Sequence, residues 1–372
     1  MSQVPTSKVS TTAVRGFARA RRGFLLLAAV GMLVVGTACD GGGGDDWQAP
    51  GKGQAAVLLD GRHSEALDLL LGGDVKGLTT AANGTVYVML DGIQRVKNDR
   101  TVESLRPNLT EGSSGLVAFS DGSLVFGKDH AIEKYGRDQQ VSVLAGVPGK
   151  GRSAAVPVPK AITAAGFRFG DYAVTPLGVR PDGALIVLDG DVVWSLANGR
   201  LTRLYEVPAA DRKTRGLDPY PAAAVDRKGT VYVSSGPRAS SARFSNVADI
   251  VAVHTDGTAA PIALPQSVAG IKGKPGDLTV NSLTGDDADG IYASTFNDDG
   301  MYVLHIHAGR ADLVAHYAYA QGKSSRSSGE CALNHPVDAK KLTCRLPTTM
   351  TYGDGKLVLG GNEHYLLQIG LK

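Results

Sequence analysis

Six times along the chain, a short apolar run is followed by a tight polar turn containing glycine and then by a run rich in β-branched residues. GLTTAANGTVYVML (77–90) and LGVRPDGALIVLDG (177–190) show this pattern clearly. The turn glycines are Gly84, Gly122, Gly183, Gly229, Gly290 and Gly355. Alternating apolar runs around Asn-Gly or Asp-Gly turns indicate β-hairpins. Because one hairpin cannot bury its apolar face alone, the repetition predicts an array of hairpin units.

A third strand follows each hairpin, and a fourth follows in the first five units. These fourth strands are expected at 101–105, 141–145, 201–206, 260–264 and 311–315. The sixth unit ends at Lys372 without one, whereas the apolar segment 54–59 precedes the first unit. Pairing this segment with the last unit would close a ring and remove two exposed sheet edges. The pattern predicts an all-β domain over 54–372: a six-bladed β-propeller of four-stranded antiparallel blades, closed by an N-terminal strand completing the last blade.

The first 38 residues have the pattern of a signal peptide. A basic segment that includes Arg21 and Arg22 precedes the apolar run 23–38, which is too short and too near the N-terminus for an ordinary membrane-spanning helix. The sequence RRGFL (21–25) is similar to the twin-arginine export motif. Arginine pairs also occur in Sec signals, so both export routes stay open.

Cys39 closes the apolar run directly after Gly36, Thr37 and Ala38, and it resembles the lipidated cysteine of bacterial lipoproteins. The resemblance implies a palmitate-bearing anchor at Cys39, a glycine-rich tether within 39–53, and a location on the outer, extracytoplasmic side of the cell membrane. Two alternatives remain at this point: cleavage before Cys39 by ordinary signal peptidase, or an uncleaved anchor. An exported chain enters an oxidising compartment, and Cys331 and Cys344 are then most simply a structural disulfide, since neither lies in a C-x-x-C pair.

Several segments together resemble the NHL-repeat β-propellers, in a form typical of an exported bacterial lipoprotein of the actinobacterial type. They are VSVLAGVPGKG (141–151), PLGVRPDGALIVLDG (176–190), PAAAVDRKGTVYVSS (221–235) and DAKKLTCRLPTTMTYGDGKLVLGG (338–361). Blade entries lack the family's Asn-His-Arg element, and the turn glycines are unevenly spaced. Since some NHL propellers are external sensor parts of bacterial receptor kinases, the resemblance implies a binding role.

Long connections are expected on one face of the ring. Connections between blades (146–176, 207–221, 265–276, 316–347) and the segment 234–248 are long, whereas the other turns are tight. In a four-stranded blade these two classes of connection emerge on the same face, and long loops on a rigid scaffold commonly carry binding sites. The binding-face candidates are Arg152, Arg168, Tyr172, Arg215, Tyr220, Arg238, Arg243, Arg326, His335 and His364. Their basic bias would attract an anionic glycan or an acidic cell-envelope protein, unless these charges serve only solubility.

Composition and motifs narrow the classes of function that this sequence can have. The net charge is only +3, and no arginine-rich block follows residue 22, which speaks against nucleic acid as a partner. G-x-S-x-G, H-E-x-x-H and a complete Walker A sequence are absent, so no catalytic residue is assigned. We therefore expect a monomeric, non-catalytic binding or scaffold module without a cofactor. The alternative is a propeller enzyme of the lyase or lactonase type with a metal in the central channel, although Gly77, Leu78, Gly115, Leu177 and Gly178 would be poor ligands there.

Blade five carries two further candidates. His305 and His307 share one side of a strand, an alternation that a metal pair can use. In the repeat they align with Arg95 and Lys97, which are expected to face solvent, so no metal site is assigned. The run Asp286, Asp287 and Asp289 lacks the spacing of an EF-hand, because Tyr292 and Asp298 occupy the positions that require Gly and Glu. It is interpreted as an acidic hairpin turn.

Overall fold

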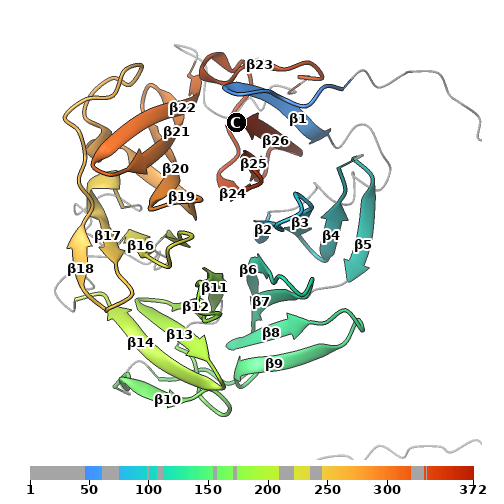
Figure 1. The fold of residues 1–372 in the computed structure, drawn as a ribbon, viewed down its shortest axis with the longest axis vertical. Coiled ribbons are helices and arrows are strands. Elements are labelled where there is room, and N and C mark those ends of the chain that lie inside the picture. Colours follow the sequence, from blue (N-terminus) through green and yellow to red (C-terminus); the bar gives the residue numbers. More distant parts are fainter. Residues whose placement is uncertain are drawn as a thin grey trace, which may run out of the picture. The chain divides into compact units, whose positions relative to one another are not determined.

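The computed structural model describes residues 47–60, 75–98, 100–106, 112–153, 157–170, 174–208, 222–234, 245–319, 331 and 333–372. These residues form six antiparallel sheets around a common centre, with β2, β6, β11, β19 and β24 among the strands nearest to it (Figure 1). Helical structure in this part of the chain consists of the 3-10 helices η1 (Val247–Asp249), η2 (Pro275–Asp277) and η3 (Ala339–Lys341). None of the described helices is long and apolar enough to cross a membrane. The all-β, six-bladed propeller predicted from the sequence is confirmed.

Each blade is a meander whose strands run from the centre outward. Blade one contains β2 (Gly77–Thr80), β3 (Val86–Met89), β4 (Ile93–Val96) and β5 (Val102–Arg106), and blade two contains β6 (Ser113–Ala118), β7 (Leu124–Lys128), β8 (Ala131–Tyr135) and β9 (Val141–Gly146). Blade three contains β11 (Thr175–Val179), β12 (Leu185–Asp189), β13 (Val192–Ala197) and β14 (Arg200–Glu206). Blade four contains β15 (Ala223–Val225), β16 (Val231–Ser234), β17 (Ile250–Val253) and β18 (Ala259–Pro261), and blade five contains β19 (Thr279–Gly285), β20 (Gly290–Asn297), β21 (Gly300–His307) and β22 (Arg310–Ala318).

Blade six is assembled from both ends of the propeller. Its inner strands are β24 (Thr349–Gly353), β25 (Lys356–Gly360) and β26 (Tyr365–Gly370), and β1 (Gln54–Asp60) pairs antiparallel with β26. Val57 lies opposite Leu367, and both side chains are almost wholly buried. The predicted closure by an N-terminal strand is therefore present, and it leaves no open gap between the first and last units.

Two long connections add an outer strand that the sequence pattern did not predict. β10 (Ala161–Thr163) pairs with β14, and β23 (Val337–Asp338) pairs with β1, so blades three and six each have five strands. After β10, the ring of Phe167 packs edge-on against Trp194, with ring centroids 5.2 Å apart. These connections therefore run partly along the outer wall and are not displayed wholly on one face. Pairing covers the edge of the outermost strand, and the phenylalanine ring shields a buried tryptophan.

Neighbouring blades pack face to face through apolar side chains, and some contacts require the absence of a side chain. A Cβ atom at Gly127 would lie 1.5 Å from the carbonyl oxygen of Val174. The second strand of blade two can therefore approach blade three this closely only with glycine. The buried cluster around Trp194 spans the same two blades and includes Ile132 and Phe169.

The end of the predicted tether lies against the propeller. Trp47 Nε1 donates a hydrogen bond to the carbonyl oxygen of Val57 at 2.7 Å, and the guanidinium of Arg100 lies 5.1 Å from the centroid of the Trp47 ring. The Gly53 N–H also bonds the Gly370 carbonyl at 2.9 Å. The predicted signal peptide and Cys39 lie outside the described residues.

Cys331 and Cys344 lie at disulfide-bonding distance, with their sulfur atoms 2.05 Å apart. Both residues are buried in the apolar cluster between blades five and six, together with Leu346 and Met301. The pairing agrees with the disulfide predicted from the sequence. It anchors the connection that leads into blade six.

Candidate functional site: the channel and its short-turn mouth

The innermost strands of all six blades line a central channel of about 760 Å³. At one end, here called the long-connection mouth, the channel is lined by Lys76, Ser114, Thr175, Asn281 and Thr349. At the other end, here called the short-turn mouth, the lining includes Asp226, Arg227, Asp286, Asp287, Tyr352 and Lys372. Charged groups are therefore concentrated where the tight hairpin turns lie.

Hydroxyl groups of the channel wall join neighbouring blades to one another. Ser114 Oγ donates to the Val174 carbonyl at 3.0 Å, and Ser282 Oγ donates to the Thr348 carbonyl at 2.5 Å. Around these groups the wall contains many Gly, Ala, Leu and Val residues, including the predicted Gly77 and Leu78, together with several threonines. Two polar groups differ from this pattern, because Nδ2 of Asn281 and Oγ1 of Thr80 are buried and have no hydrogen-bond partner among the described residues.

At the short-turn mouth, Asp287 joins blades four, five and six. Its carboxylate accepts a hydrogen bond from Tyr352 Oη at 2.5 Å and lies 3.3 Å from both Lys372 Nζ and Arg227 Nη1. Burial disfavours the charged form of Asp287, but the bonds from Tyr352 and Lys372 outweigh it and hold the pKa of this carboxyl below its ordinary value. Asp287 therefore stays ionised and ties three blades together.

Asp286 belongs to the same hairpin turn, but its side chain is almost fully buried. Its carboxylate accepts bonds from the backbone N–H groups of Ala288 at 2.8 Å and Gly290 at 2.9 Å, and its Oδ2 lies 2.8 Å from Nε2 of His305. Burial opposes ionisation, yet these three bonds outweigh it and lower the pKa of Asp286. The predicted acidic hairpin turn is thus present between β19 and β20, and it fixes one histidine.

Four aromatic rings form a stacked column beside this mouth. Tyr352 stacks on Tyr292 at 5.3 Å, Tyr292 on His305 at 4.4 Å, and His305 on His307 at 4.3 Å between ring centroids. Tyr292 and His305 are direct partners across β20 and β21, so their rings share one side of the blade. Burial, followed by the charges of the two neighbouring aspartates, raises the pKa of Tyr292 to about 12.

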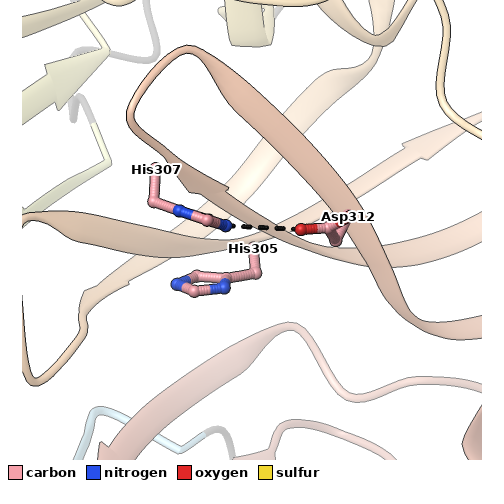
Figure 2. Close-up of side chains that lie close together, drawn as sticks. All are labelled: His305, His307 and Asp312. Carbon is pink, nitrogen blue, oxygen red and sulfur yellow. Dashed lines mark hydrogen bonds and ion pairs between the residues drawn. The ribbon is translucent and has the colours of Figure 1, made fainter.

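The outer end of the column carries a second carboxylate. His307 Nε2 lies 3.3 Å from Asp312 Oδ2, and Figure 2 shows the His305 ring beside this pair. One possible ligand atom from each of His305, His307 and Asp312 lies within 4.8 Å of the others. The three side chains are 23%, 30% and 70% exposed. Sequence reasoning identified the histidines and the hairpin turn with Asp286, but it missed the contact of Asp286 with His305 and it missed Asp312. Counting back from the tight turn after His307 would have placed Asp312 opposite His305.

Four of the ten predicted binding-face residues lie within the described structure. Arg168, His335 and His364 are exposed, whereas Arg152 is mostly buried and its Nη2 lies 3.7 Å from the fully buried Asp189 carboxylate. The remaining candidates lie outside the described residues: Tyr172, Arg215, Tyr220, Arg238, Arg243 and Arg326.

Solved structures with a similar fold include proteins of different kinds. A protein of unknown function from Bacteroides thetaiotaomicron matches 85% of this chain and 75% of its own, with a TM-score of 0.56 and 11% identity. A gluconolactonase from Xanthomonas campestris matches 86% of this chain and 89% of its own, with a TM-score of 0.50 and 18% identity. These likenesses show the β-propeller fold. No protein-family model and no curated protein matches the sequence.

Proposed function

We propose that this chain is an extracytoplasmic binding or scaffold module that is anchored to the membrane through a lipid on Cys39. In this proposal the propeller presents a rigid face to a cell-envelope protein or an anionic glycan, and the long connections supply the contacts. No reaction takes place in the channel.

The channel wall is the observation that carries the proposal. Its serine hydroxyls at Ser114 and Ser282 are engaged with backbone carbonyls of the next blade, and many of the other wall residues are apolar or glycine. These groups stiffen the ring and are not aimed at a substrate. A rigid ring that carries variable loops is suited to recognition.

The alternative is a propeller enzyme of the lyase or lactonase type, and Asn281 is the residue that favours it. Its buried, unpartnered amide Nδ2 lines the long-connection mouth. The other described lining residues there offer hydroxyl groups and the ammonium of Lys76, which is a poor donor set for a divalent ion. The channel residues therefore do not fit a resident metal well.

A pair of assays separates the two functions. We expect the purified full-length chain to cosediment with isolated cell-wall polymer in a salt-dependent manner, as an electrostatic contact requires, and to leave a panel of lactones unhydrolysed with Mg²⁺, Ca²⁺ or Zn²⁺ present. Lactone hydrolysis by the wild type that is lost in Asn281→Ala would overturn the proposal in favour of the enzyme. Radiolabelled palmitate tests the anchor, since it should mark the wild type and not Cys39→Ser.

A further inference from the structure

Blades one and five have equivalent cross-strand residue positions near their short turns, but different types of side chain occupy these positions. In blade one, Arg95 lies opposite Tyr87 on one side and opposite Glu103 on the other. In blade five, His305 lies between Tyr292 and Asp312 in the same way. In blade one, two permanently charged cations surround the Glu103 carboxylate. Arg95 bonds this carboxylate, and Lys97 Nζ lies 3.5 Å from it. Blade five surrounds its carboxylate with two imidazoles.

A further difference between these blades lies in the first hairpin turn. The N–H of Ala81 bonds the Thr85 carbonyl in blade one, and the N–H of Asp286 bonds the Gly290 carbonyl in blade five, so Asp286 stands where blade one has alanine. The added carboxylate bonds Nε2 of His305. A histidine that binds a metal commonly donates its other ring N–H to a carboxylate, which fixes the ring. In this arrangement Nδ1 of His305 is the nitrogen left for an ion.

The geometry allows three side chains to reach one ion. Residues two apart on a strand and their direct cross-strand partners project from the same face of a sheet, which places His305, His307 and Asp312 together. Ligand atoms around a tetrahedral ion with bonds near 2.1 Å lie about 3.4 Å apart. His307 Nε2 and Asp312 Oδ2 are already 3.3 Å apart, and both side chains are exposed enough to adjust.

We propose that His305, His307 and Asp312 bind a divalent transition-metal ion of the zinc class, with Asp286 positioning His305. Two imidazole nitrogens and one carboxylate suit such an ion better than Mg²⁺ or Ca²⁺, which take oxygen ligands. Three protein ligands leave at least one coordination position open to solvent. The site lies on blade five beside the short-turn mouth, and it is independent of the binding function proposed above.

Zinc titration of the purified, untagged full-length chain by calorimetry tests the site. We expect saturable binding of one Zn²⁺ per chain, and we expect Co²⁺ to give the d–d absorption of a nitrogen- and oxygen-ligated ion. The double variant His305→Arg/His307→Lys recreates the arrangement of blade one, so it should keep the wild-type thermal unfolding curve and bind at least 100-fold more weakly. Asp286→Asn should weaken binding by about 10- to 100-fold, because the ring would no longer be held by a carboxylate.

Two controls make the result specific. His254→Ala removes an exposed histidine just after the third strand of blade four and should leave the titration unchanged. Asn281→Ala alters the channel wall and should also leave it unchanged. Zinc binding that persists in the double variant, or no saturable binding by the wild type, would overturn the proposal. An ion that persists in the double variant but is lost in Asn281→Ala would instead belong to the channel and support the enzyme alternative.

Discussion

Ala55 lies directly opposite Ile369 in an antiparallel sheet, and neither side chain is accessible to solvent. The last blade is therefore complete only with the first described strand. Closure of this kind makes the stability of the whole ring depend on one strand pair, because opening that pair exposes two sheet edges together.

The contribution of this closing strand can be measured with two valines. Val57→Ala removes two methyl groups from a side chain that is 2% exposed, and we expect it to lower the free energy of unfolding by about 2 kcal/mol. Val143→Ala on β9 is the matched control, because that side chain is 47% exposed, and its effect should stay below about 0.5 kcal/mol. Urea unfolding gives both values. Equal effects would show that β1 contributes nothing special to the ring.

Reduction of the disulfide should destabilise the chain. Cys331 and Cys344 are 13 residues apart, and a crosslink of that length stabilises by about 3 kcal/mol in the chain-entropy account. We expect the urea midpoint to fall when dithiothreitol is added to the wild type. The double variant Cys331→Ser/Cys344→Ser should unfold at that lower midpoint with or without the reductant. An unchanged wild-type midpoint under reducing conditions would contradict this prediction.

The hairpin turn of blade two should give a measurable dependence on pH. Bonds from the Ser123 hydroxyl and N–H, followed by Lys134, lower the pKa of Asp121 to about 2. Because the folded pKa lies below the unfolded value near 4, this stabilisation is present above about pH 4 and is lost as the pH falls toward 2. The Asp121 side chain is 58% exposed, so screening limits the effect to about 0.5–1 kcal/mol. Asp121→Asn should lose that amount at pH 7.

Urea unfolding of both proteins across the acid range checks the sign. The difference between Asp121→Asn and the wild type should shrink as the pH approaches 2. A difference that stays constant between pH 7 and pH 2 would mean that the charge of Asp121 is not its cause.

Contact between blades two and three should tolerate no side chain at Gly127. Gly127→Ala places a methyl group against the Val174 carbonyl, and separating the strands to admit it should cost about 3 kcal/mol. At Gly136, the added methyl would meet the Asp138 carboxylate, which can rotate away, so Gly136→Ala should change stability by less than about 1 kcal/mol. Thermal unfolding of the two variants compares them directly.

Some features of the site were within reach of the sequence and others were not. The hairpin run that includes Asp286 and the pairing of His305 with His307 on one face follow from turn chemistry and the two-residue period of a strand. The placement of Asp312 opposite His305 also follows from the tight turn after His307, because β21 and β22 pair without a register shift between that turn and His305. The bond from His305 to Asp286 needs the pairing of β20 with β21, which brings the hairpin turn before Gly290 beside the histidines.

The sequence by itself determined six units, their strand order, the closing strand and the cysteine pair, because alternation and glycine turns are local and their repetition leaves one consistent way to bury the apolar faces. Only the tertiary structure decided that β10 and β23 extend the outer edges, that Phe167 covers Trp194, and that Arg152 is drawn into a buried pair with Asp189. These contacts join segments through space after the blades have formed. Such contacts depend on which surface each folded blade leaves uncovered, and no short-range pattern in the sequence encodes this surface.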